Sequence, residues 1–478
     1  MNRRYFLKTT GLTSLAAATH ACTEADLEPQ RPNILFIMTD QQFAEIMSCR
    51  MGNQYIHTPN MDQLAEEGML FSRAYTANPL CMPARASIFT GRYPHETTVQ
   101  KNGDRMKVGE FPCIGAIFKN AGYDTGYFGK WHLSYDKDDA AIHGFNETGV
   151  LYGNGHDEAI PAPAIAFLNR PRENPFLLVA SFSNPHDVCQ LARHEPLPSG
   201  PIGEAPPLQE RPPLRANSLP PENETDIMTL MRKSYHASPT FPVGDYDEDT
   251  WRRLIWGYYR LTEKVDALIG KVLNALKASG QEENTLIVLT SEHGDCHGAH
   301  QFNQKTVFYD ESSRVPFILK YRDVITKGTT DRLINTGIDI APTLFDYAGI
   351  EQAPELPGRS LRGIAEGREP SSWREYVVVQ NLMVQGGPVD GVPPIVNGRM
   401  VRSERYKYCL YDQGQRRESL VDMAEDPGEM HNIAYDPANR EILNQHRAHL
   451  KEHAERYKDQ LAMAMLAGLQ GDRTGGEI

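Results

Sequence analysis

The sequence predicts an α/β fold with a large, mainly parallel or mixed sheet covered on both faces by helices. A smaller C-terminal domain of antiparallel strands and a helix is expected to follow. Three observations predict this arrangement. Continuous apolar runs that end in polar residues recur along the chain, as in strands buried on both faces. Segments with helical periodicity alternate with these runs. After about residue 371 the apolar runs become short.

Three apolar runs are the predicted buried strands, at 34–39 (ILFIMT), 175–182 (PFLLVASF) and 285–290 (TLIVLT). Each run is too short for a core helix and is followed by polar residues. In a parallel sheet the carboxyl ends of neighbouring strands meet at one edge, where they border a crevice. The polar residues after these runs are therefore expected to lie together.

Helices are predicted between the strands. Thr58-Pro59 begins one helix, which Gly68 ends, and a second helix begins near Ile114 and ends at Gly122. A long amphipathic helix is expected at about 250–279, because its apolar residues recur every three or four positions. The stretch 194–245 is rich in proline and acidic residues and shows no period, which predicts an excursion over the surface.

The C-terminal part has a different texture. The segments YVVVQ, RMVRSERYKYCLY and SLVDM predict short antiparallel strands, and a final helix is expected at about 439–464. The predicted organisation is an N-terminal signal or flexible segment at 1–30, a catalytic domain at 31–370 and a smaller α+β domain at 371–478.

Composition excludes some functions. The chain has 478 residues, with 49 Lys and Arg against 62 Asp and Glu, and a formal charge of −13. This balance argues against binding nucleic acid or anionic membranes, so an anionic substrate would need a local basic pocket. The seven cysteines, at positions 22, 49, 81, 113, 189, 296 and 409, show neither paired nor metal-knuckle spacing.

The N-terminus predicts export. Arg3-Arg4 precede a short, alanine-rich apolar run, the pattern of a twin-arginine (Tat) signal. The run is shorter than the roughly 20 residues of a membrane span, so no transmembrane segment is expected in the mature chain. The Tat machinery is the predicted export partner and the periplasm or cell surface the predicted location. Cys22 is a candidate lipidated N-terminus, although the residues before it suit lipoprotein cleavage poorly.

The ends of the predicted strands carry metal-binding residue types. Asp40 and Gln41 follow the first strand, and Glu292 and His293 follow the run at 285–290. Their hard oxygens suit one divalent cation, Ca²⁺ or Mg²⁺, although the imidazole of His293 is less typical of such sites. Taken singly, each residue has a structural alternative, such as a turn cap or a buried histidine.

Several motifs together carry a resemblance to a known family. PNILFIMTDQQ at 32–42, Cys81-Met-Pro-Ala-Arg85 with Thr90-Gly91, GYFGKWHL at 126–133 and SEHGD at 291–295 occur in that order. LVDMAEDPGEMHNI follows near the end. On these motifs the chain resembles the type I, formylglycine-dependent sulfatases of the alkaline phosphatase superfamily. The resemblance implies an alkaline phosphatase-like sheet and hydrolysis of sulfate esters, most simply those of a carbohydrate.

The resemblance also implies roles for individual residues. A sulfatase-maturation enzyme would oxidise Cys81 to formylglycine, which would join Asp40, Gln41, Glu292 and His293 around the cation. The remaining roles are Arg85 holding nucleophile and metal, Lys130 and Lys305 binding sulfate oxygens, His186 protonating the leaving group, and His132 taking a proton from the nucleophile. The division of labour between His132 and His186 stays open, as do the choice of metal and the oligomeric state.

Three departures from the family pattern leave alternatives. Gln41 stands where a second Asp or Asn is frequent, Glu292 where Asp is usual, and Ala84 where Ser is more common. One alternative is a phosphate or phosphonate ester hydrolase of the same superfamily. The other is a noncatalytic glycan-binding relative in which Cys81 stays a thiol.

Overall fold

The computed structural model describes residues 31–107, 109–150, 155–351, 355–368 and 370–474. Residues 32–478 form one compact unit, which is the subject of this section. The predicted Tat signal and Cys22 lie outside the described residues. Among those residues, no helix combines the length and apolarity that crossing a membrane requires.

The large sheet has eight strands, all parallel to their neighbours except β8. Their order across the sheet is β5 (Glu147–Gly149), β4 (Asp124–Gly129), β6 (Phe176–Pro185), β1 (Asn33–Asp40), β7 (Thr285–Ser291), β8 (Phe317–Lys320), β2 (Met69–Phe71) and β9 (Gly328–Thr330). The three strands predicted from apolar runs are β1, β6 and β7, which lie side by side at the centre. The predicted α/β class is confirmed.

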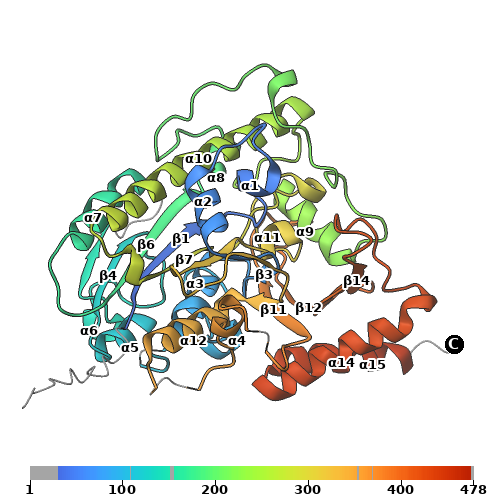
Figure 1. Ribbon diagram of the computed structural model, residues 1–478. Helices are drawn as coiled ribbons and strands as arrows, with labels where there is room; N and C mark the ends of the chain where they lie inside the picture. The colour runs from blue at the N-terminus through green and yellow to red at the C-terminus, as the bar shows by residue number, and fades with distance from the viewer. Residues whose placement is uncertain (1–30, 108, 151–154, 352–354, 369, 475–478) are drawn as a thin grey trace, which may run out of the picture. The chain divides into compact units, whose positions relative to one another are not determined.

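Helices cover both faces of this sheet (Figure 1). The α-helices are α1 (Ser48–Met51), α2 (Pro59–Glu67), α3 (Cys81–Thr90), α4 (Pro94–Thr97), α5 (Ile114–Asn120), α6 (Ala140–His143), α7 (Pro161–Leu168), α8 (Val188–Ala192), α9 (Asp226–His236), α10 (Glu248–Ala278), α11 (Asp310–Ser313), α12 (Thr336–Ala348), α13 (Arg362–Ala365), α14 (Arg440–Tyr457) and α15 (Gln460–Thr474).

Strand β1 shows why both faces are apolar. Ile34, Phe36 and Met38 pack into a core with α3, α5 and α12, whereas Leu35 and Ile37 pack into a second core with α2, α7 and α10. All five side chains are fully buried, as alternation along a doubly covered strand requires.

The C-terminal sheet is antiparallel, as the short apolar runs predicted. Its strands are β11 (Tyr376–Met383), β12 (Val396–Ser403), β13 (Tyr406–Tyr411) and β14 (Glu418–Asp422), paired in that order. A two-stranded sheet of β3 (Ala74–Tyr75) and β10 (Ile334–Asn335) completes the strands. These elements belong to the same compact unit as the large sheet. The domain boundary at 371 stays a prediction.

Two predicted segments were wrong. The stretch 194–245 contains α9, whose Ile227, Met231 and Tyr235 recur at helical spacing and are buried. The proline-rich flanks of this segment hide its period. The final helix is also two helices, α14 and α15, because Lys458 has a positive φ of 61° that ends α14.

A buried charge cluster joins the C-terminal sheet to the rest of the unit. The Nζ atom of Lys407, on β13, lies 2.5 Å from Asp310 Oδ1 and 2.6 Å from Glu429 Oε1, and it donates to the carbonyl of Phe308. The Lys407 side chain is 1% exposed. Two carboxylates are buried beside this ammonium, and burying them without its positive charge would destabilise the fold.

Replacing Lys407 with Met is expected to lower the free energy of unfolding by about 3–5 kcal/mol, because Glu429 stays buried without its counter-ion and Asp310 keeps only its ion pair with Arg314. Chemical denaturation followed by circular dichroism measures the change. The matched control is Lys451→Met, since that exposed ammonium lies 3.8 Å from Glu455 and should contribute less than about 1 kcal/mol. Equal destabilisation by both variants would contradict the account.

Candidate active site

Cys81 is the first residue of α3, a helix whose ten residues are all buried. Leu80 before it is extended, and Pro83 lies in the first turn, where the missing N–H of proline costs no helical hydrogen bond. The side chain of Leu80 cannot cap the helix. Asn102 does so instead, because its Oδ1 accepts the backbone N–H of Met82 at 3.0 Å. The Cys81 thiol is thus carried by the first residue of a helix that is buried along its length and capped by Asn102.

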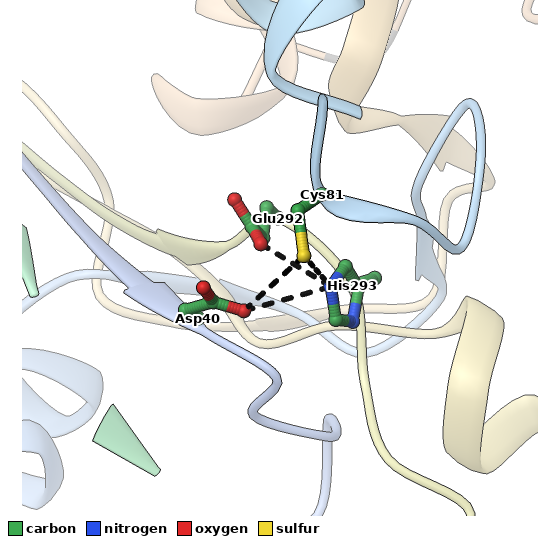
Figure 2. A group of neighbouring side chains, drawn as sticks. All are labelled: Asp40, Cys81, Glu292 and His293. Carbon is green, nitrogen blue, oxygen red and sulfur yellow. Dashed lines mark hydrogen bonds and ion pairs between the residues drawn. The ribbon is translucent and has the colours of Figure 1, made fainter. Parts of the chain in front are cut away.

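The rims of β1 and β7 bring Asp40 and Glu292 to this thiol. Thr39 pairs with Ser291 in the parallel register, so the next residues on both strands are neighbours. Figure 2 shows Asp40, Glu292 and His293 converging on Cys81. The Cys81 Sγ atom lies 3.2 Å from His293 Nε2 and 3.9 Å from Asp40 Oδ1. The sequence-based expectation that strand ends converge is met for these residues.

The ring of His293 is oriented for ligation. Its Nδ1 donates a hydrogen bond to the Gly294 carbonyl at 2.8 Å, so Nε2 is the nitrogen that faces the other site residues. Nε2 faces Glu292 Oε1 at 3.2 Å and Asp40 Oδ1 at 3.5 Å. A backbone acceptor on the far nitrogen is the usual arrangement behind a metal-bound histidine.

The donor set suits a divalent cation. One ligand atom from each of Asp40, Cys81, Glu292 and His293 can be chosen so that all four lie within 4.8 Å of one another, and all four residues are buried. Glu292 forms an ion pair with Arg85 and a hydrogen bond with the ring of His293. Two buried carboxylates that face a thiol and an imidazole nitrogen offer a cation oxygen and nitrogen ligands in one place.

Gln41 lies beside this group and contacts a lysine. Its Oε1 accepts a hydrogen bond from Lys305 Nζ at 2.5 Å, and its Nε2 donates to Asp295 Oδ2 at 2.6 Å. The second contact fixes which end of the amide carries the oxygen. Gln41 therefore presents its oxygen towards Lys305, and its role as a ligand stays a prediction.

Three buried cations compensate the carboxylates. Lys130 pairs with Asp40, while Arg85 pairs with Glu292 and donates through Nη1 to the Lys130 carbonyl, Trp131 carbonyl and Ser181 Oγ. Arg85 is fully buried and Lys130 and Lys305 are nearly so. The contacts of Arg85 make it a clamp between a predicted metal ligand and the strand end that carries Lys130.

The cations set the protonation of the centre. Burial and the Cys81 charge act to raise the pKa of Asp40, but Lys130, His186 and Lys305 outweigh them and hold that pKa well below its usual value. Burial likewise opposes ionisation of Cys81, yet Lys305, Lys130 and His293 lower the pKa of the thiol strongly. Burial raises the pKa of Glu292, and the charges of Asp40 and Cys81 raise it further against the effect of Arg85. Arg85 therefore compensates the negative charge of Glu292 only in part. A bound cation would supply the positive charge that is lacking.

His132 and His186 are the partly exposed members of the site. Both interact with the Cys81 thiol. Burial lowers the pKa of both, and Lys305 and Lys130 help to lower that of His186 to about 4. The structure thus brings all six predicted catalytic residues around one centre, and their roles stay predictions.

Comparison with known proteins identifies the family. The family model described as Sulfatase matches residues 32–350, about two thirds of the chain. The chain belongs to the sulfatase family. A second model, described as N-sulphoglucosamine sulphohydrolase, C-terminal, matches residues 298–456 of the sulfatase. The relatives of this chain are named as sulfatases, and the chain is a sulfuric ester hydrolase.

Individual relatives cover nearly the whole sulfatase. The Delta 4,5-hexuronate-2-O-sulfatase of Bacteroides thetaiotaomicron is 31% identical over 465 residues, which cover 92% of each chain. The N-acetylglucosamine-6-O-sulfatase of the same organism is 28% identical and covers 94% of this chain and 90% of that one. A solved 2-O GAG sulfatase superposes with a TM-score of 0.77 at 30% identity, covering 90% of this chain and 93% of that chain.

Two further residues of the sulfatase support the site and were missed in the sequence. Asp157 is buried and accepts the backbone N–H groups of Ser183 and Asn184, both at 2.7 Å, so it fixes the turn before His186. Asp295 orients Gln41. Asp295 is the last residue of the SEHGD segment, but no role was predicted for it, whereas no local pattern marks Asp157.

Adding Ca²⁺ or Mg²⁺ to the chelator-treated sulfatase is expected to raise its melting temperature. A ligand that binds only the folded state stabilises it by about 2.7 kcal/mol at 100 times Kd. In Asp40→Asn, the loss of one charged ligand should move the midpoint of this titration to a concentration at least roughly tenfold higher. Glu283→Gln, which removes a carboxylate that is 75% exposed, is the control. An unchanged midpoint in Asp40→Asn would remove Asp40 from the metal site.

Proposed function

We propose that the sulfatase hydrolyses sulfate esters of carbohydrates, using a formylglycine made from Cys81 and one divalent cation. The observation that carries this proposal is the position of Cys81 Sγ, 3.2 Å from His293 Nε2 and within the Asp40, Glu292 and His293 donor set. The names of the relatives, which specify hexuronate and N-acetylglucosamine sulfates, support a carbohydrate substrate.

Maturation requires a two-electron oxidation of Cys81. The Cβ–S bond breaks, sulfur leaves as hydrogen sulfide, and Cβ gains a carbonyl oxygen from water, while a sulfatase-maturation enzyme passes the two electrons to an external two-electron acceptor. Cys-x-Pro-Ala-Arg, at 81–85, is the segment that this enzyme would recognise. Addition of water to the aldehyde then places two hydroxyl groups on one carbon.

Sulfuryl transfer follows from these two hydroxyls. One attacks the sulfur of the ester, the bond from sulfur to the alcohol oxygen breaks, and the alcohol leaves with a proton. The second hydroxyl then loses its proton, the carbonyl forms again, and the bond from carbon to the sulfate oxygen breaks. The aldehyde avoids a second attack at sulfur, which a serine ester would need.

The residues around the aldehyde divide this work. Asp40, Gln41, Glu292 and His293 would hold the cation, which when bound acts as a Lewis acid and compensates negative charge. Lys130 and Lys305 bind the sulfate oxygens. Their ammonium groups are fixed before the substrate arrives, so they stabilise the negative charge on these oxygens without reorganisation. His186, with Lys305, protonates the leaving alcohol, and His132 accepts the proton of the second hydroxyl.

We further propose that the enzyme is exported in folded form through the Tat machinery. Arg3-Arg4 and the short apolar run support this step. Export of a folded chain allows Cys81 to be modified in the cytoplasm first, and places the enzyme in the periplasm or at the cell surface.

Co-expression with a maturation enzyme tests the proposal. Peptide mass spectrometry across Cys81 is expected to show the aldehyde, and the matured protein is expected to release sulfate from aryl and sugar sulfates. Turnover of an aryl phosphate is measured in parallel. A strong preference for phosphate would favour the phosphoesterase alternative, and an unmodified thiol with no activity would favour the noncatalytic binder.

Cys81→Ser is expected to accept at most one sulfuryl group per molecule. Serine lacks the second hydroxyl, so the sulfated enzyme should persist as a stable ester. Intact mass spectrometry after incubation with an aryl sulfate detects this adduct, and Cys113→Ser, which changes another buried cysteine, is the control. Sustained turnover by Cys81→Ser would exclude the formylglycine route.

A further inference from the structure

The backbone around Lys305 has an unusual conformation. Gln304 before it and Thr306 after it have positive φ angles, of 66° and 72°. Residues other than glycine rarely adopt this left-handed region, and a β-branched residue such as Thr306 is strained there. Such angles persist only where the surrounding structure holds them. The three residues are buried, so contacts inside the protein must hold this bend at 304–306.

Tyr235, on α9, supplies two of these contacts. Its hydroxyl group donates a hydrogen bond to the Lys305 carbonyl at 2.5 Å and contacts the hydroxyl group of Thr306. The Lys305 carbonyl is bonded to the Cα atom that carries the ammonium side chain. The Tyr235 hydroxyl group therefore fixes the point from which the Lys305 side chain starts.

The ring of Tyr235 is fixed independently of its hydroxyl group. It is fully buried, stacks on Phe241 with ring centroids 4.4 Å apart, and makes a T-shaped contact with Phe302 at 5.4 Å. A phenylalanine ring makes the same aromatic contacts. Tyr235→Phe should therefore remove the hydroxyl group and leave the packing of the ring unchanged.

Two backbone hydrogen bonds tie the bend to the active site. The N–H of Thr306 donates to the Pro79 carbonyl at 3.0 Å, and Pro79 lies two residues before Cys81. The N–H of Cys296 donates to the Gln304 carbonyl at 2.6 Å. The bend is therefore held against the segments that carry the predicted nucleophile and two of the predicted metal ligands.

From this bend the Lys305 side chain reaches Gln41, whose Oε1 accepts a hydrogen bond from the ammonium group at 2.5 Å. A displacement of about 1 Å can lower the rate of an enzyme by about 100-fold. We propose that Tyr235 is a positioning residue, whose hydroxyl group holds the Lys305 backbone so that the ammonium group reaches the sulfate. The inference rests on the proposed function, in which Lys305 binds sulfate and helps to protonate the leaving alcohol.

A double-mutant cycle in the matured enzyme tests this role. Tyr235→Phe is expected to lower kcat/KM for an aryl sulfate by about tenfold, less than Lys305→Ala, because the ammonium group is displaced but still present. In the Lys305→Ala background, Tyr235→Phe should change kcat/KM by less than about twofold, because no ammonium group remains to be misplaced. An equal loss in both backgrounds would overturn the proposal, as would a loss below about twofold in Tyr235→Phe alone.

Tyr123→Phe is the matched control. Tyr123 is buried, and its hydroxyl group donates to the Pro32 carbonyl at 3.1 Å. This variant loses a hydrogen bond of the same kind, so its melting temperature should fall by a similar amount, whereas its kcat/KM should change by less than about twofold. A similar loss of activity in both variants would show that reduced stability alone causes it, and would overturn the proposal.

Hydrogen exchange separates this inference from the proposed function. Protein expressed without a maturation enzyme is sufficient, and peptides that span 302–308 report on the bend. Tyr235→Phe should speed exchange in these peptides by about fivefold, the factor that corresponds to one hydrogen bond, and Tyr123→Phe should not. If this difference is seen but the matured enzyme releases no sulfate, the proposed function fails and the placement of Lys305 by Tyr235 stands. Unchanged exchange in Tyr235→Phe would overturn that placement, whatever the activity.

Discussion

The compensation of buried negative charge is the constraint on which the site depends. Asp40, Glu292 and an acidic Cys81 meet where water is excluded, and isolated charges in such a place would be strongly unfavourable. Lys130, Lys305 and Arg85 offset them from three different segments. Only the folded sheet brings these segments together, so the site is sensitive to any change in packing that separates these charges.

Parallel strand ends supply this assembly. The ends of β1, β6 and β7 lie next to one another, so Asp40, His186 and Glu292 reach one edge from distant parts of the sequence. Helix α3 brings Cys81 to the same edge, with its first turn capped by Asn102 from outside the helix. The strands fix the predicted ligands, and the helix fixes the predicted nucleophile. The partly exposed His132 and His186 lie where a substrate can approach.

Much of this could be predicted from local patterns. The buried strands, α10 and the C-terminal strands follow from apolar runs and periodicity. The predicted metal ligands follow from the polar residues at strand ends, whereas the other site residues follow only from the resemblance to the sulfatases. The role of Asp157 could not be predicted, because this residue binds the backbone of Ser183, which is distant in the sequence. The break between α14 and α15 could not be predicted either, because it depends on the positive φ of Lys458 alone. Helix α9 was missed because proline-rich flanks obscure its apolar face.

The C-terminal sheet reaches close to Lys305, a predicted catalytic residue. Asn381, on β11, donates to the carbonyl of Thr306, which directly follows Lys305. Lys407, on β13, holds the Phe308 carbonyl two residues further along. Recombining this half of the chain with that of another sulfatase would therefore disturb the placement of Lys305 itself. Chimeras are therefore best cut outside the tract from 305 to 429, so that Lys305 and the strands that hold its segment come from the same parent.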